Sequence, residues 1–159
     1  MVLVPDYLLS KEKARQQYDA AFHLLHVTYP MVNDPKLLIG IISNLFSTLE
    51  SSMEMILKYE RQLQLVPNYP DSFKYKLDLF CRKSVRRNNI PHSFIHLILE
   101  LKDTLELHKQ TPMAFQRGNR LVLCNKEYSM KVLSLKTIKE FLDKSKEFLE
   151  LSERIVKLR

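Results

Sequence analysis

The chain has 159 residues, of which 45% are hydrophobic and 27% charged, and only two are glycine. This size and hydrophobic content predict a single domain over residues 1–159 that buries one core, and the scarcity of glycine favours long helices over a many-turned sheet. The sequence has no uninterrupted run of 18 apolar residues and no secretory signal, so we expect no membrane span or membrane partner. Cys81 and Cys124 are the only cysteines, which allows a disulfide but does not require one, and the default setting is reduced and cytoplasmic.

The formal net charge of +7 is unevenly distributed along the chain. Residues 1–80 hold 8 Lys and Arg against 9 Asp and Glu, whereas residues 81–159 hold 17 against 9. An acidic partner such as nucleic acid would fit the basic second half. A net charge of this size can also serve only to keep the protein soluble, without any acidic partner.

The first two expected helices are set by helix-start signals and by apolar residues that recur every three or four positions. Ser10 is expected to cap the first helix, which Tyr29-Pro30 would end. Asp34 followed by Pro35 is a strong start for the second helix, which should be the longest. These two helices are expected at about residues 10–28 and 35–64.

Three further helices are expected in the second half of the chain. Asn89 would cap the fourth helix, with Pro91 in its first turn, and the residues that precede Asn89 would form a basic loop. Ser134 would cap the last helix. The expected ranges are residues 71–83, 89–109 and 135–158.

Residues 112–133 have a different composition and predict a β-hairpin insertion before the last helix. Two short apolar stretches flank a Gly118-Asn119 turn, and residues 130–133 could add a third strand. Arg117 and Arg120 lie on either side of the turn, where they could contact a phosphate, although solvated loop charges are the commoner outcome. The predicted fold is therefore mainly α, an antiparallel bundle of about five helices with a small β-hairpin.

The stretch from Cys81 to His96 carries the strongest functional signal. Four cations, Arg82, Lys83, Arg86 and Arg87, precede a helix start that holds His92. Cations bind phosphate, and a histidine can transfer a proton near pH 7. This combination suggests a site that binds or cleaves RNA. The structural alternative is a basic loop that leads into an ordinary helix.

Within this stretch, Arg87-Asn88-Asn89-Ile90-Pro91-His92 has the pattern Arg-Asn-x-x-x-His. A guanidinium makes two parallel contacts with phosphate oxygens, and a nearby cation keeps the imidazole available as a base. With this motif at the start of a late helix, the chain resembles the HEPN superfamily of small helical bundles. The resemblance covers the helical part, roughly residues 10–109, and the hairpin lies outside the common core.

The resemblance implies a metal-independent endoribonuclease with a composite site where two protomers of a homodimer meet. His92 would transfer the proton, Arg87 would stabilise the charge on the phosphorane, and Asn88 would orient the phosphate or His92. Arg82, Lys83 and Arg86 would attract the RNA backbone in a salt-sensitive way. Active members of the superfamily are often toxins held by an antitoxin partner.

Two alternatives remain open from the sequence. His92, His96 and Glu100 are spaced four residues apart and could hold a metal ion if a further ligand joined them. The chain could also be a non-catalytic module whose helical faces bind a protein partner. The sequence has no Gly-rich phosphate loop, no Gly-x-Ser-x-Gly, no His-Glu-x-x-His and no cysteine pairs at zinc spacing, so no metal or cofactor is expected.

Overall fold

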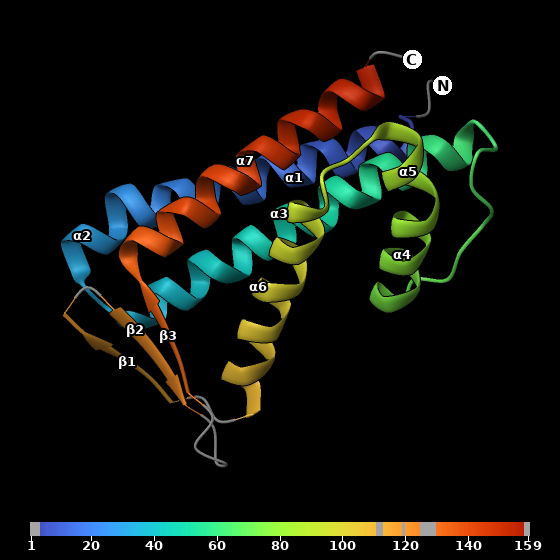
Figure 1. The fold of residues 1–159 in the computed structure, drawn as a ribbon. Helices are drawn as coiled ribbons and strands as arrows, with labels where there is room; N and C mark the ends of the chain where they lie inside the picture. The colour runs from blue at the N-terminus through green and yellow to red at the C-terminus, as the bar shows by residue number, and fades with distance from the viewer. Residues whose placement is uncertain (1–3, 111–112, 119, 125–129, 158–159) are drawn as a thin grey trace.

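The computed structural model describes residues 4–110, 113–118, 120–124 and 130–157. Most of them are helical (Figure 1), as the sequence predicted. The helices in chain order are α1 (Asp6–His23), the π-helical segment η1 (Leu24–Thr28), α2 (Tyr29–Val32), α3 (Pro35–Gln62), α4 (Phe73–Leu79), the π-helical segment η2 (Phe80–Ser84), α5 (Val85–Asn88), α6 (His92–Gln110) and α7 (Leu135–Lys157).

Three long helices, α1, α3 and α7, lie side by side, and α6 crosses α3 at an angle (Figure 1). The buried apolar face of α3 supplies much of the core, including Leu45, Leu49 and Ile56, each without exposed surface. Phe148 of α7 lies 5.1 Å from Phe94 of α6, measured between ring centroids. This contact holds the first turn of α6 against the three-helix layer.

The helix starts follow the local signals only in part. Asp34 caps α3 as predicted, because its Oδ1 atom accepts a hydrogen bond from the backbone N–H of Lys36 at 3.0 Å. The prediction for Ser10 is wrong: α1 begins at Asp6 and Ser10 is buried inside it. The Ser10 hydroxyl accepts a hydrogen bond from Lys58 Nζ at 3.0 Å, so this side chain joins α1 to α3.

Tyr29-Pro30 does not end the first helical segment, contrary to expectation. The chain continues through η1 and α2 until Asn33, which adopts a left-handed conformation with φ of 56°. Proline disrupts a helix by removing an i to i−4 hydrogen bond, but it is tolerated in a first helical turn. Pro30 lies in the first turn of α2, directly after a π-helical stretch in which the i to i−4 ladder is already interrupted.

The predicted hairpin is present and belongs to a three-stranded antiparallel sheet in the order β1-β2-β3. Strands β1 (Met113–Arg117) and β2 (Arg120–Cys124) meet at the Gly118 turn, where φ is +62°, and β3 (Met130–Ser134) pairs with β2. The buried side chains of Leu121, Leu123 and Leu133 join the main hydrophobic core. As predicted, Ser134 caps α7: its hydroxyl accepts a hydrogen bond from the Thr137 N–H at 3.1 Å.

No helix within the described residues has the length and apolar character needed to cross a membrane.

Candidate functional site

The basic segment that precedes His92 is helical, which corrects the predicted loop. Helix α4 begins after Ser72, whose hydroxyl accepts a hydrogen bond from the Tyr75 N–H, and the helical path continues through η2 and α5 to Asn88. Phe80 and Val85 are buried, so one face of this helical segment packs against the core. The basic residues therefore share the opposite, exposed face, which holds Arg82, Lys83 and Arg86.

The turn between α5 and α6 also differs from the prediction. Asn89 does not cap α6; it is the C-cap of α5, in a left-handed conformation with φ of 53°. The backbone N–H of Ile90 donates to Val85 O at 3.0 Å, which closes the end of α5, and the Ile90 side chain is buried. With Ile90 anchored in the core, α6 can begin only after Pro91, at His92.

Glu60 of α3 is the centre of the polar contacts made by the motif. Its side chain has no exposed surface. Its Oε1 atom accepts a hydrogen bond from the Ser84 hydroxyl, and its Oε2 atom lies 2.7 Å from Arg87 Nη1 and 3.2 Å from Asn88 Nδ2. A buried carboxylate needs such partners, because its desolvation is otherwise very costly.

Arg87 and Asn88 make additional contacts inside the same protomer. Arg87 Nη2 donates to Leu65 O at 3.0 Å, and the Arg87 side chain is only 26% exposed. Asn88 Nδ2 also donates to Ser84 O at 2.9 Å. Both motif residues therefore bind α5 to the end of α3, a role that the sequence did not suggest.

The sequence contains one signal that could have identified Glu60 as a buried residue of the site. Glu60 continues the three- and four-residue spacing of Met53, Ile56 and Leu57 on the apolar face of α3, where all three are fully buried. A glutamate at such a position is expected to need a cationic or hydrogen-bonding partner. The identity of that partner depends on the tertiary fold.

His92 differs from the other two motif residues because its side chain is exposed. It is the first residue of α6, where the backbone N–H groups of the first turn have no partner within the helix. No described residue forms a hydrogen bond or ion pair with its imidazole. The imidazole is therefore accessible to a ligand from solvent.

The surroundings of the α5–α6 turn have two different electrostatic sides. Lys83 and Arg86 are exposed on the η2–α5 side, and neither has an acidic partner among the described residues. On the α7 side, a pocket beside Pro91 is lined by Glu147 and Glu150 together with Arg154, and Glu150 also pairs with Lys146. That side is of mixed charge, so the exposed cations Lys83 and Arg86 make the η2–α5 side the more attractive one for a polyanion.

Two of the predicted phosphate contacts, Arg117 and Arg120, do not join this site. Arg82 shares the exposed face with Lys83 and Arg86, and it also pairs with the exposed Asp78 at 2.9 Å. Arg117 and Arg120 are exposed and flank the hairpin turn, which lies at the α2 end of the molecule, away from α5 (Figure 1). The structure thus separates them from His92.

The proposed ladder of metal ligands is not assembled. Among the residues that the structure describes, no three His, Cys, Asp or Glu side chains are grouped so that they could hold a metal ion. The carboxylate of Glu100 instead lies 3.6 Å from Lys131 Nζ, on β3. His92 and His96 remain as two exposed histidines one turn apart on α6.

No disulfide joins Cys81 and Cys124. Burial raises the pKa of the half-buried Cys81 thiol, and the nearby Asp78 acts in the same direction. A raised pKa disfavours the thiolate that a nucleophilic cysteine needs. Cys81 instead packs against the hydrophobic core.

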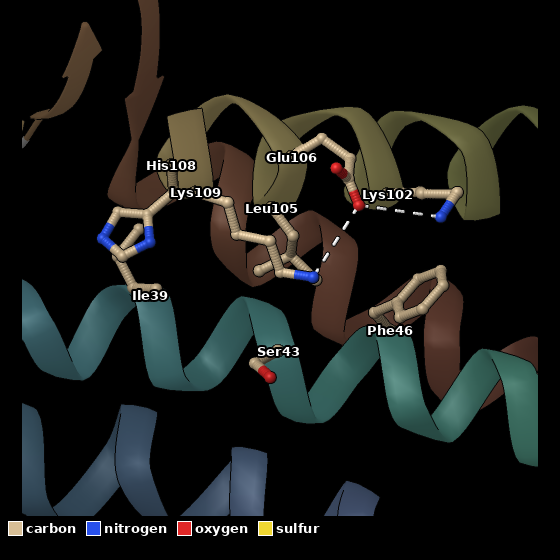
Figure 2. A pocket seen from close by; sticks show the side chains of 8 residues that line it. All are labelled: Ile39, Ser43, Phe46, Lys102, Leu105, Glu106, His108 and Lys109. Carbon is tan, nitrogen blue, oxygen red and sulfur yellow. Dashed lines mark ion pairs between the residues drawn. The ribbon is translucent and has the colours of Figure 1, made fainter. Parts of the chain in front are cut away.

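A separate groove lies between α3 and α6 and has a volume of about 360 Å³ (Figure 2). Its apolar lining comes from Ile39 and Phe46 of α3 and Leu105 of α6, and its rim carries Lys102 and Lys109. It contains none of the motif residues.

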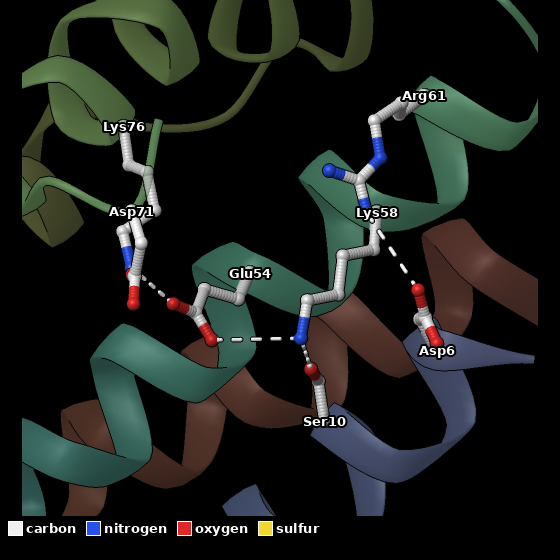
Figure 3. A network of polar contacts seen from close by, with 7 residues as sticks. All are labelled: Asp6, Ser10, Glu54, Lys58, Arg61, Asp71 and Lys76. Atoms are coloured by element: carbon white, nitrogen blue, oxygen red, sulfur yellow. Dashed lines mark hydrogen bonds and ion pairs between the residues drawn. The ribbon is translucent and has the colours of Figure 1, made fainter. Parts of the chain in front are cut away.

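A polar network fixes α4 against α3 (Figure 3). The ammonium group of Lys76, which is nearly buried, pairs with Glu54 and with Asp71. Burial by itself lowers the pKa of Lys76, but the hydrogen bonds to Glu54 and Asp71 outweigh it and the pKa is raised. The charged lysine therefore anchors the start of the helical path that carries the basic face.

The chain matches no protein-family model, no curated protein and no solved structure.

Proposed function

We propose that this protein binds RNA on the exposed face of η2 and α5 and cleaves it without a metal ion, in the manner of a HEPN-type ribonuclease. The observation that carries the proposal is the accessible imidazole of His92 at the start of α6, which directly follows the η2–α5 segment whose exposed face holds Lys83 and Arg86. An accessible imidazole beside cations is what proton transfer at a phosphodiester requires.

The reaction would proceed by attack of the ribose on its own phosphate. His92 removes the proton from the 2′-hydroxyl, the 2′ oxygen bonds to phosphorus, and the bond from phosphorus to the 5′ oxygen breaks. The products are a 2′,3′-cyclic phosphate and a 5′-hydroxyl, whose oxygen takes its proton from an imidazolium. The His92 side chain of a second protomer would supply that acid, which is the reason to propose a homodimer.

Arg87 has a specific part in this proposal. Its guanidinium is fixed by Glu60 and by Leu65 O, and its positive charge would stabilise the negative charge that develops on the phosphate oxygens. Asn88, which Glu60 also holds, would keep α5 in place beside the phosphate. Both residues would thus act from positions that are set before the substrate arrives.

The test is incubation of the protein with single-stranded RNA in the presence of a chelator. His92→Ala is compared with His96→Ala, because both histidines are exposed on α6 and lie one turn apart. Cleavage that persists with chelator, disappears in His92→Ala and remains in His96→Ala supports the proposal, provided that circular dichroism shows both variants folded. Absence of cleavage by the wild-type dimer, or equal activity of the two variants, overturns it.

A second candidate function is a non-catalytic module that binds a protein partner, for example an antitoxin-like protein. Two observations favour it: the polar groups of Arg87 and Asn88 are engaged inside the protomer, and the α3–α6 groove has an apolar lining with lysines at its rim. The expected result is then intact RNA together with a stable complex that Phe46→Glu abolishes.

A further inference from the structure

We infer that the turn that follows α3 forms a subsite for one unpaired nucleotide of the RNA. This inference rests on the proposed function and assigns it a second contact region. The turn borders a shallow, solvent-open pocket of about 560 Å³. The pocket lining includes Arg61, Gln64, Leu65, Pro67, Asn68 and Lys83.

The pocket adjoins Arg87 of the candidate cleavage site. Leu65, which lines the pocket, provides the carbonyl oxygen that accepts the hydrogen bond from Arg87 Nη2 at 3.0 Å. Lys83 lies one helical turn before Arg87 and contributes to the pocket wall. A strand bound with one phosphate near Arg87 would therefore bring a neighbouring nucleotide to this pocket.

The lining has the three kinds of group that hold a nucleotide. The Gln64 and Asn68 amides offer donors and acceptors to the edge of a base. Leu65 and Pro67 offer apolar surface to its faces. Lys83 and Arg61 offer positive charge to its phosphate.

Arg61 is also held in a defined orientation. Its guanidinium lies 4.9 Å from the centroid of the Tyr69 ring, and it pairs with Asp6 at 3.7 Å. A base can stack on a guanidinium plane as it does on an aromatic ring. Tyr69 covers one face of the guanidinium and the Arg61 side chain remains 30% exposed, so the opposite face is the one that we expect to contact a base.

The backbone of the turn is fixed before any ligand binds. Gln64 is left-handed, with φ of 61°, and the backbone N–H groups of Gln64 and Leu65 donate to Arg61 O and Glu60 O at 3.0 and 2.8 Å. This pair of bonds is the Schellman arrangement that ends a helix firmly. Val66 is only 5% exposed and anchors the turn in the core. A fixed turn loses little entropy when it binds a nucleotide.

The expected ligand is a single-stranded nucleotide and not a duplex. In an RNA helix the base edges are paired and the stacked faces are covered, so a base cannot enter a pocket. An unpaired base has both its edge and its faces available. The protein should then prefer an unstructured oligonucleotide over a hairpin stem of the same composition.

The experiment separates binding at the turn from cleavage at His92. Binding is measured with a fluorescent single-stranded RNA that carries 2′-O-methyl groups and cannot be cleaved, and cleavage kinetics are measured with the unmodified RNA. Asn68→Trp, which fills the pocket, is paired with Gln62→Trp on the exposed end of α3. Lys83→Glu is paired with Lys74→Glu, an exposed lysine on α4 outside the pocket.

Asn68→Trp and Lys83→Glu should each weaken binding about tenfold, as expected for one lost stacked base or phosphate contact, whereas both controls bind like the wild type. In cleavage, the two variants should raise KM far more than they lower kcat. Wild-type binding by both variants overturns the subsite even if His92-dependent cleavage is present. Weakened binding without any cleavage by the wild type retains the subsite and overturns the ribonuclease proposal.

Discussion

The Nη1 atom of Arg87 lies 2.7 Å from the Oε2 atom of Glu60, whose carboxylate has no exposed surface. This ion pair links the end of α3 to α5, the last turn before the exposed His92. A buried ion pair is not in itself strongly stabilising, but removal of one partner leaves the other charge uncompensated. The motif that suggested catalysis therefore has a structural role in the protomer, and stability measurements must accompany any activity measurement on it.

Glu60→Gln should destabilise the protein by about 2–4 kcal/mol. The substitution leaves the Arg87 guanidinium without its counter-charge, and the effect falls somewhat below that of a fully buried pair because Arg87 is a quarter exposed. Urea unfolding followed by circular dichroism measures the change. Glu106→Gln on α6 is the control, since its pairs with Lys102 and Lys109 are on the surface and should be worth less than about 1 kcal/mol. Equal losses in the two variants would contradict the structural role of Glu60.

Glu60 and Arg87 should also be energetically coupled. In a double-mutant cycle with Glu60→Gln and Arg87→Lys, the effect of the pair should differ from the sum of the single effects by about 1–3 kcal/mol. Lysine retains the charge of arginine but cannot reach Glu60 and Leu65 O with a rigid fork of donors. The free energies of unfolding of the four proteins give the coupling. Additive effects within about 0.3 kcal/mol would show that the contact contributes nothing of its own.

The features that could be predicted from the sequence are those set by neighbouring residues. Asp34 with Pro35, the Gly118 turn and the Ser134 cap each act through a bond or a dihedral angle within three residues, and each appears as expected. The mainly helical fold with its hairpin follows from the same local signals.

The features that could not be predicted depend on contacts between distant elements. Asn89 has the side chain of an N-cap, but burial of the following Ile90 turns it into the C-cap of α5. Ser10 is also a typical N-cap residue, but its hydroxyl instead accepts a hydrogen bond from Lys58 of α3. Within the candidate site, the enclosure of Arg87 depends on the end of α3, where Glu60 and Leu65 O contact it, and the spacing of the motif carries no such information.

Gln64→Gly should stabilise the protein by about 0.5–1 kcal/mol. Gln64 adopts φ of 61° at the end of α3, a conformation that costs a residue with a side chain about 1–2 kcal/mol and costs glycine nothing. The greater freedom of glycine in the unfolded chain removes part of this gain. Gln62→Gly, at the last residue of α3, should instead destabilise by about 1 kcal/mol or less. Thermal unfolding of both variants measures the difference, and a loss of stability in Gln64→Gly would be inconsistent with the left-handed turn.

Glu50→Gln should raise stability at pH 7, and the gain should vanish in acid. Burial raises the pKa of the Glu50 carboxyl above its ordinary value of 4.5, although Lys76 opposes the shift. The folded state therefore binds the proton more tightly than the unfolded state, so ionisation of Glu50 reduces stability as the pH rises from the ordinary pKa through the raised one. Below the ordinary pKa both states are protonated, and this penalty is absent. Glutamine lacks the charge at every pH, so the difference in free energy of unfolding between variant and wild type should be positive at pH 7 and shrink toward zero near pH 3.5. Glu140→Gln on the exposed face of α7 serves as the control. A Glu50→Gln difference that is the same at both pH values would show that ionisation of this carboxyl does not oppose folding.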